Sequence, residues 1–374
     1  MRPLKRLMIF GFVMATASAL VGWPPVAAYA DSIRDAQWHL DALAADRVHK
    51  ISRGAGVTVA LIDTGVSTDS PDLSDAVAAG TDLLPDPIGD GRDDINGHGT
   101  QMAGIIAGRG HGGGRGVLGI APEAKILPIR SPINAITTHD YVTQAVIFAK
   151  QHGANVINMS FGGMDDTVLH NAIRDAKAAD IVVVASSGNL DGPRGDYPGK
   201  YPEVLTVGAS NQDGGIADFS QTGPQVDVVA PGVDIVTTGI SGSGYYEGSG
   251  TSEATAVVSG AVALVRARFP ELSADEVVHR ITATARDAGK PGRDDEYGYG
   301  RLDVLRALTA DVPAAAPSSA SSSPDTSPPN GLGQQAGTER TSPLLVAGVA
   351  AGGVLLVGGL LVAFLVGRGR GRRR

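Results

Sequence analysis

An aspartate, a histidine and a serine occur in that order along the 374-residue chain, each within two residues of a glycine. Asp63 follows an apolar run, His98 lies within Asn-Gly-His-Gly-Thr, and Ser252 ends a Gly-Thr-Ser segment. A serine hydroxyl is a weak nucleophile at neutral pH. It becomes reactive when an imidazole takes its proton and a carboxylate holds that imidazole in the required tautomer. The three residue types therefore predict nucleophilic acyl transfer.

Each of the three segments also has a simpler interpretation. An aspartate after a strand is often a turn residue or a helix cap, a histidine between glycines is usually a loop residue, and Gly-Thr-Ser is a common loop tripeptide. The local contexts favour catalysis. The run 57–62 predicts a buried parallel strand that ends at Asp63, where open α/β sheets form their sites. His98 and Ser252 each precede a stretch of small or apolar residues of helical length, and a helix N-terminus provides a positive field.

The order and contexts of these segments resemble the subtilisin-like serine proteases over about residues 35–310. The resemblance implies that Asn189, which follows the strand-like run 181–185, donates a hydrogen bond to the oxyanion beside the backbone N–H of Ser252. It also implies a set of substrate-binding residues. These are the strand-like edge Ser160, Phe161 and Gly162, the pocket wall Ser187 and Gly188, and Asp196 at the base of the first specificity pocket. Asp196 there would favour Lys or Arg substrates, and its alternative is an exposed loop residue that pairs with Arg194.

Apolar strand patterns alternate with helical patterns through the rest of this region. Further strands are predicted at 125–129, 156–159 and 204–207, and helices at 141–151, 167–178 and 273–283. The last helix begins with a capping box formed by Ser273 and Glu276. Such alternation predicts an α/β fold, a mostly parallel sheet with helices on both faces. The glycine-rich run 108–116 lacks the Lys-Ser/Thr ending of a phosphate-binding loop, and a surface loop is expected.

The segment around Ser252 departs from the subtilisin-like pattern. Glu253, Thr255 and Ala256 stand where the family usually has Met or a similar residue, a small residue and Pro. Alanine suits a helix better than proline does, so Ala256 is compatible with the fold. A carboxylate beside the nucleophile is expected to raise the imidazole pKa and to repel an oxyanion.

Both ends of the chain carry targeting signals. Residues 1–30 predict a signal peptide, with Arg2, Lys5 and Arg6 before an apolar run and Ala-Tyr-Ala at the cleavage site, so that the mature chain starts near Asp31. We expect a peptidase domain at 31–311, a Pro/Ser/Ala-rich linker at 312–343, a transmembrane helix at 344–366 and a basic cytoplasmic tail at 367–374. A buried core helix and a removable lipid-anchor signal are the alternatives for the uncharged segment.

Composition limits the cofactors and partners. The chain has no cysteine, which excludes disulfides, thiolate metal sites and a cysteine nucleophile. All 39 acidic residues lie between Asp31 and Glu339, so the exported portion is acidic and no nucleic-acid partner is expected. No cofactor and no metal are predicted. The acidic segment with Asp86, Asp90, Asp93 and Asp94 could be a calcium loop, but it lacks the ligand spacing, and a solvated acidic loop is favoured.

The short stretch between the predicted cleavage site and Asp63 leaves no room for a long prodomain. With the signal, linker, membrane span and basic tail, this organisation resembles the mycosins, membrane-anchored proteases associated with type VII secretion. Two functions follow. In the first, the protein is a membrane-anchored extracytoplasmic serine endopeptidase that acts on proteins or peptides. In the second, it is a structural partner of a membrane secretion complex, with secondary or no proteolysis.

Overall fold

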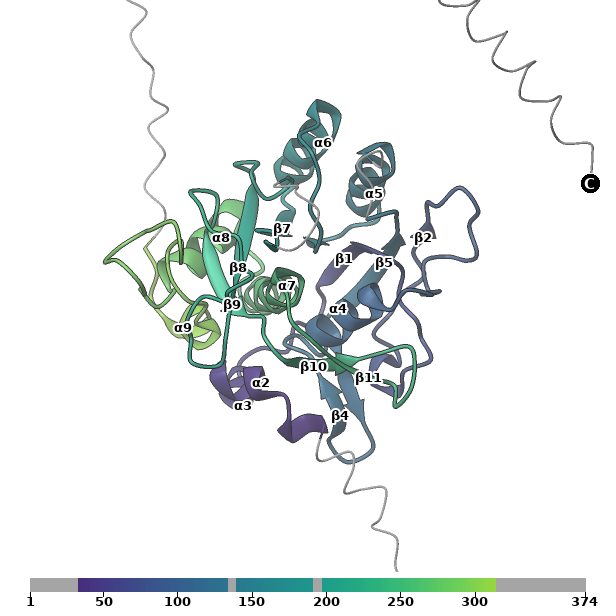
Figure 1. The fold of residues 1–374 in the computed structure, drawn as a ribbon, viewed down its shortest axis with the longest axis horizontal. Coiled ribbons are helices and arrows are strands. Elements are labelled where there is room, and N and C mark those ends of the chain that lie inside the picture. The colour runs from purple at the N-terminus through teal and green to yellow at the C-terminus, as the bar shows by residue number, and fades with distance from the viewer. Residues whose placement is uncertain (1–32, 134–138, 191–196, 314–374) are drawn as a thin grey trace, which may run out of the picture. The chain divides into compact units, whose positions relative to one another are not determined.

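The computed structural model describes residues 33–133, 139–190 and 197–313 (Figure 1). All the described residues belong to one compact unit. The predicted signal peptide, transmembrane helix and basic tail lie outside the described residues, as do Asp196 and most of the predicted linker. Within the described residues, no helix combines the length and the apolar character needed to cross a membrane.

A seven-stranded sheet forms the centre of the fold, and all its described strand pairs are parallel. In spatial order its strands are β2 (Thr81–Asp82), β5 (Lys125–Arg130), β1 (Thr58–Asp63), β6 (Val156–Met159), β7 (Val182–Ser186), β8 (Val204–Ser210) and β9 (Val228–Pro231). The mostly parallel sheet predicted from the sequence is confirmed. Two antiparallel pairs lie outside it, β3 (Arg109–His111) with β4 (Arg115–Leu118) and β10 (Ile235–Thr238) with β11 (Tyr245–Gly248).

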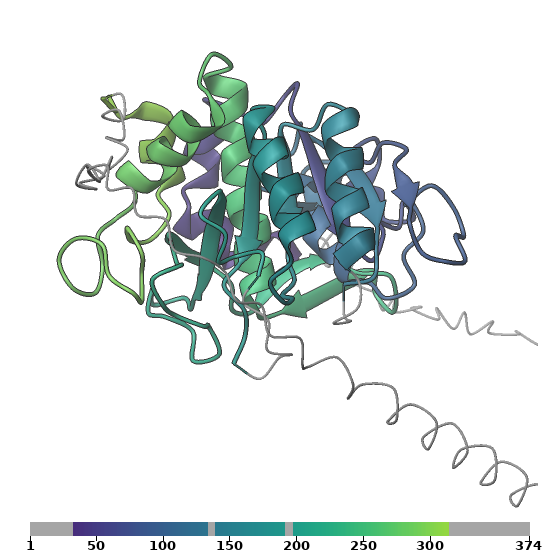
Figure 2. The same cartoon turned by 90° about the horizontal axis from the view of Figure 1, so that it is seen from above.

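Side chains of β1 alternate between two hydrophobic cores, one on each face of the sheet. Val59 and Leu61 belong to the larger core, and Ala60 and Ile62 to the smaller one. The larger core is covered by α2 (Trp38–Ala42), α3 (Ala45–Val48), α4 (His98–Ala107), α7 (Thr251–Arg268), α8 (Ala274–Ala283) and α9 (Val304–Thr309). The helices α5 (His139–Gln151) and α6 (Thr167–Ala178) cover the smaller core and lie side by side (Figures 1 and 2). Burial on both faces explains why the strands are almost continuously apolar.

The chain reverses its direction of travel across the sheet at β1. Of the strands that come after β1 in the chain, β5 pairs with one side of β1. The next strand, β6, pairs with the other side, so the chain continues in the opposite direction across the sheet. Such a reversal opens a crevice at the carboxyl ends of the strands. Asp63 ends β1, Ser160 follows β6 and Ser187 follows β7, so the fold brings these predicted site residues to one edge of the sheet.

The glycine-rich run 108–116 was predicted to be a surface loop, and this prediction is wrong in part. Its two ends belong to β3 and β4, which pair as a hairpin, and only its middle is a turn. Gly113 and Gly114 have positive φ angles at the tip, a backbone conformation that glycine adopts without strain. Buried Asp72 holds the hairpin because it accepts hydrogen bonds from the His111 ring and the backbone N–H of Val117.

The remaining sequence predictions of secondary structure are close to the observed elements. The predicted helix at 141–151 begins two residues earlier, at His139, and α6 has the predicted bounds. Ser273 is the N-cap of α8, and it forms the predicted capping box with Glu276.

Candidate active site

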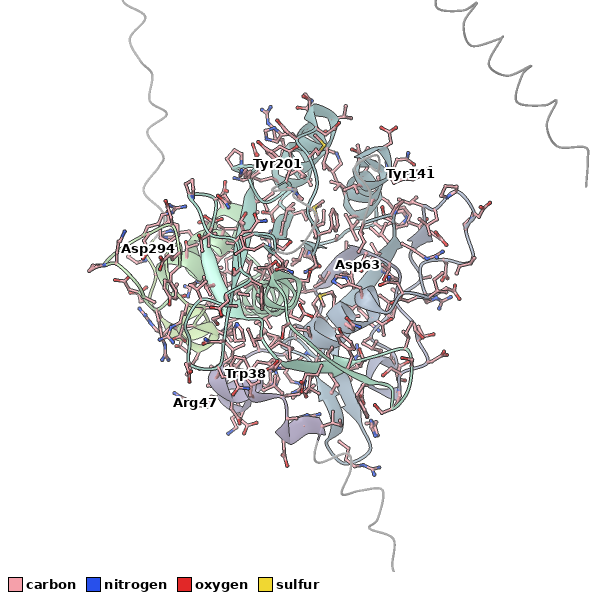
Figure 3. All side chains as sticks on the ribbon, viewed as in Figure 1. Trp38, Arg47, Asp63, Tyr141, Tyr201 and Asp294 are labelled. Atoms are coloured by element: carbon pink, nitrogen blue, oxygen red, sulfur yellow. The ribbon has the colours of Figure 1, made fainter. Side chains whose placement is uncertain are left out.

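Asp63 lies at the centre of the molecule, at the end of β1 (Figure 3), and it forms a hydrogen-bonded pair with His98, the first residue of α4. The His98 Nδ1 atom lies 2.8 and 2.9 Å from the two carboxylate oxygens of Asp63. Asp63 is fully buried, and the His98 side chain is 26 % exposed. A carboxylate on Nδ1 directs the other ring nitrogen, Nε2, away from Asp63 and fixes the tautomer in which Nε2 can accept a proton.

Glycines on both sides of His98 allow this approach. Gly97 is the N-cap of α4 and has a φ of +104°, which disfavours any residue with a side chain. A Cβ atom on Gly99 would clash with the carbonyl oxygen of Gly65, just after Asp63. The first turn of α4 can therefore pack against the end of β1 only because these positions are glycines.

Asp94 holds the loop that leads to His98, a role that the sequence did not reveal. Its carboxylate accepts hydrogen bonds from the Thr64 hydroxyl, from the backbone N–H groups of Asn96 and Gly97, and from both the N–H and the hydroxyl of Thr100. Asp94 is 8 % exposed, so the expectation of a solvated acidic loop is wrong for this residue. Its position four residues before His98 was the only sequence signal. The described residues contain no group of three or more His, Asp or Glu side chains that could hold a metal ion.

Ser252 is the second residue of α7 and faces the segment after β6. Its hydroxyl donates a hydrogen bond to the Ser160 carbonyl at 3.0 Å, and the Ser160 hydroxyl donates to the Ser252 carbonyl at 3.2 Å. Across the described residues, the Ser252 hydroxyl makes no hydrogen bond with the His98 ring. The structure thus brings Ser252 to the same edge of the sheet as Asp63 and His98, but with its hydroxyl turned toward Ser160.

Asn189 is joined to the first turn of α7. Its side-chain oxygen accepts hydrogen bonds from the Thr251 N–H at 3.0 Å and from the Thr251 hydroxyl at 2.8 Å. Because a backbone N–H can only donate, these bonds identify the amide oxygen and leave Nδ2 as a donor. A Cβ atom on Gly250 would lie 3.4 Å from Nδ2 of Asn189 and 3.6 Å from the backbone nitrogen of Ser252. The two predicted oxyanion donors therefore lie near the same space beside Gly250, which also holds the Glu253 Oε2 atom, 2.7 Å from that point.

Replacing Asn189 by alanine is expected to lower kcat about 10² to 10³-fold, because one of these two donors is lost while Ser252 and His98 stay in place. Steady-state kinetics on a peptide substrate measures the effect. Gln221 offers a matched amide, since its Nε2 donates to the Asn189 carbonyl at 3.3 Å without bordering that space. Equal losses from Asn189→Ala and Gln221→Ala would contradict a specific role of the Asn189 side chain.

The predicted substrate-binding residues lie on neighbouring loops. Gly163, which follows the edge formed by Ser160, Phe161 and Gly162, exchanges two backbone hydrogen bonds with Tyr197, at 2.6 and 3.2 Å. The Ser187 hydroxyl and the Gly188 carbonyl both bond to the backbone of Gln221, each at 2.9 Å. Asp196 lies outside the described residues, next to Tyr197.

Carboxylates dominate the electrostatics of the site. Burial alone would lower the pKa of His98, but the charge and hydrogen bond of Asp63, together with the charges of Glu253 and Asp94, raise this pKa to about 9. Burial raises the pKa of Glu253, and the nearby Asp63 charge adds to this rise, while the bond to its own backbone N–H and the charge of His98 oppose it.

The sequence and the structure were also compared with those of known proteins. The model of the Subtilase family matches residues 54–300. Mycosin-1 of Mycobacterium tuberculosis is 36% identical, over 87% of this chain and 84% of its own length. A crystal structure of MycP1 with its N-terminal propeptide removed superposes with a TM-score of 0.67 at 34% identity and covers 74% of this chain and 98% of MycP1. MycP3, a protease from the type VII (ESX-3) secretion system, gives a TM-score of 0.64 at 35% identity, covering 73% and 88% of the two chains.

Proposed function

The chain belongs to the subtilase family of serine endopeptidases, and from that premise we propose that Asp63, His98 and Ser252 form its catalytic triad. Ser252 attacks the scissile carbonyl and forms the acyl-enzyme. His98 takes the Ser252 proton and later gives it to the leaving amine, and Asp63 orients the imidazole and stabilises its charged form. The Asn189 side chain and the Ser252 N–H hold the oxyanion.

The bond between Asp63 and His98 Nδ1 carries this proposal. It joins a buried carboxylate to an imidazole whose Nε2 is available, at the sheet edge where Ser252 begins its helix. The helix N-terminus adds a positive field at the nucleophile. Many ion pairs of proteins are only structural, but this one lies at the sheet edge to which the fold also brings Ser252 and Asn189.

We further propose that an extended peptide adds as a strand along Ser160, Phe161 and Gly162. Backbone hydrogen bonds of this kind capture a peptide with little demand on its sequence. Ser187 and Gly188 would form one wall of the first specificity pocket, and Asp196 its base. A carboxylate at that base favours Lys or Arg before the scissile bond.

The ends of the chain lead to a proposal about location. A signal peptide at 1–30, a peptidase domain at 31–311, a linker at 312–343, a transmembrane helix at 344–366 and a cytoplasmic tail at 367–374 would anchor the enzyme outside the cell membrane. The similarity to Mycosin-1 and to MycP3 supports association with a type VII secretion complex.

This topology predicts the outcome of external proteolysis. A protease added to intact cells, or to spheroplasts where a wall shields the surface, should remove the catalytic domain by cleavage within the linker and leave residues 344–374 in the membrane. Immunoblots against tags at both ends of the mature chain measure this. A catalytic domain that is protected until the membrane is permeabilised would contradict export.

Cleaved proteins in living cells test the proposed function. Proteomics of new N-termini should find a set of cleavages in cells with the parent enzyme that is absent in cells with Ser252→Ala. The same cells test the structural alternative, because a protein that acts only as a partner of a secretion complex would support secretion equally in both. Identical sets of new N-termini would contradict the endopeptidase function.

A further inference from the structure

A cavity of about 150 Å³ lies where the first described helices meet the last one. It is lined by residues of α2, α3, β9 and α9 and by the segment that follows β8. Helices α3 and α9 contact each other although they come from opposite ends of the described chain (Figure 1). Trp38 and Arg47, which line the cavity, lie apart from Asp63 (Figure 3). The cavity is therefore separate from the candidate active site.

Among the described residues, three arginines but a single carboxylate line this cavity. The carboxylate is Asp303, which pairs with Arg286 Nε at 2.7 Å and accepts the backbone N–H of Arg306 on its other oxygen. No ion pair and no side-chain hydrogen bond in the described part of the chain involves Arg47 or Arg301. The neighbouring carboxylates are exposed and line no part of the cavity: Asp41, Asp46 and Asp213. Two positive charges of the wall are thus unpaired, although the exported portion as a whole is acidic.

The side chain of Arg301 is partly buried, and its guanidinium lies against the wall. Its Nε atom is buried without a hydrogen-bond partner. Its Cζ atom lies 2.9 Å from the point that a Cβ on Gly214 would occupy, and Gly214 itself lines the cavity. Buried Arg266 differs, because it directs Nη1 to the Asp180 carboxylate at 2.9 Å. A buried guanidinium donor without a partner carries a desolvation cost that a bound anion would offset.

The rest of the wall combines apolar side chains with one amide. Trp38, Leu302 and Leu305 line it, and Trp38 Nε1 already donates to two backbone carbonyls, at 3.0 and 3.2 Å, so the indole offers its apolar ring. Asn211 Oδ1 accepts a backbone N–H at 2.9 Å, which leaves Nδ2 as a donor. Pockets for drug-sized ligands measure about 300–1,000 Å³, so this smaller cavity suits a small group.

We propose that this cavity is a binding site for a carboxylate carried on a short carbon chain. The unpaired guanidinium groups of Arg47 and Arg301 bind the carboxylate, since the planar fork of arginine matches its two oxygens, and the apolar wall contacts the carbon chain. A free organic acid and the acidic side chain of a bound protein share this chemistry. The inference does not depend on the proposed catalytic mechanism, because the described residues that line the cavity do not include the triad.

The fluorescence of Trp38 can report binding. The chain has two tryptophans, and Trp23 lies in the predicted signal peptide, so the mature chain carries Trp38 alone. Succinate added to the mature chain in an uncharged detergent should change this fluorescence in a saturable way, and salt should weaken the binding. Isothermal titration calorimetry of the same sample measures the affinity. No saturable binding by either measurement would overturn the inference.

Arginine variants test which side chains bind the probe. Arg301→Gln should weaken succinate binding about tenfold or more, because a charged donor is lost. Arg47→Gln should weaken it about threefold from an exposed position, and it carries the test if Arg301→Gln does not fold. Arg306→Gln removes the same charge from an exposed position of α9 outside the cavity, and its affinity should equal that of the parent. Equal affinities in the parent, Arg47→Gln and Arg301→Gln would overturn the inference.

Further probes distinguish the two sources of the carboxylate. A peptide capped at both ends with one glutamate carries the group on a polypeptide, and its glutamine counterpart is the control. Competition with succinate by the glutamate peptide alone assigns the site to an acidic side chain of a protein. Succinate binding without such competition assigns it to a free organic acid, and both results support the inference. Inorganic phosphate has no carbon chain for the apolar wall, so tighter binding of phosphate than of succinate would overturn the assignment of a carboxylate.

Discussion

Replacing Ser252 or His98 by alanine should lower turnover about 10⁶-fold, the scale of loss known for triad residues in subtilisin. In the proposed mechanism Ser252 supplies the attacking oxygen, and without His98 that oxygen would keep its proton. The Ser160 hydroxyl is no ready substitute for Ser252, because it already donates hydrogen bonds to Asn158 and to the Ser252 carbonyl. Steady-state hydrolysis of a peptide substrate measures the loss.

The double variant provides the control for this prediction. Since the triad works as a unit, Ser252→Ala combined with His98→Ala should cost little more than either change alone. Additive losses would mean that the two residues act independently. Near-normal hydrolysis by Ser252→Ala would remove Ser252 from the mechanism altogether.

Asp63→Asn should lower kcat about 10⁴-fold, although the shape of the side chain is kept. In the structure both carboxylate oxygens of Asp63 accept from His98 Nδ1, at 2.8 and 2.9 Å, which places the free lone pair on Nε2. An asparagine can turn its NH₂ group toward Nδ1, and the imidazole would then carry its proton on Nε2 and lose its function as a base. Measurement of kcat together with the NMR tautomer signature of His98 tests this cause.

Asp90 offers a matched control for Asp63. Its side chain is 40% exposed and pairs with Arg92 at 2.7 Å in the loop before His98, so Asp90→Asn should leave kcat close to that of the parent. If Asp63→Asn lost no more activity than Asp90→Asn, the Asp63–His98 bond would be structural and the proposed triad would be wrong.

The strands, the main helices and their order could be predicted because their signals are local. Strands buried on both faces, such as β1, must be apolar at nearly every position, and this pattern is visible in a single sequence. The sequence positions of Asp63 and Ser252 follow from the same signals, since one ends a strand and the other begins a helix. The hairpin formed by β3 and β4 was missed because its glycine-rich sequence carries no alternating apolar pattern. Its pairing depends on buried Asp72, which lies elsewhere in the chain and bonds to the backbone N–H of Val117.

Side-chain networks could not be predicted because they depend on tertiary contacts. In the sequence, Asp94 is one of four aspartates in an acidic segment, and nothing distinguishes it from the other three. Only the folded loop shows that its carboxylate accepts hydrogen bonds from five donors. Glu253 was visible as a departure from the family pattern. Its burial against Gly248 and Gly250 and the bond between Ser252 and Ser160 appear only in three dimensions.

The central claim is that Ser252 is the nucleophile of an assembled triad, and covalent labelling tests it most directly. The full-length protein is treated with a fluorophosphonate at alkaline pH, and the adduct is mapped by peptide mass spectrometry. We predict one adduct, on Ser252, that is lost in Ser252→Ala and strongly slowed in Asp63→Asn. Folded protein that takes no label, or label that persists in Ser252→Ala, would contradict the account.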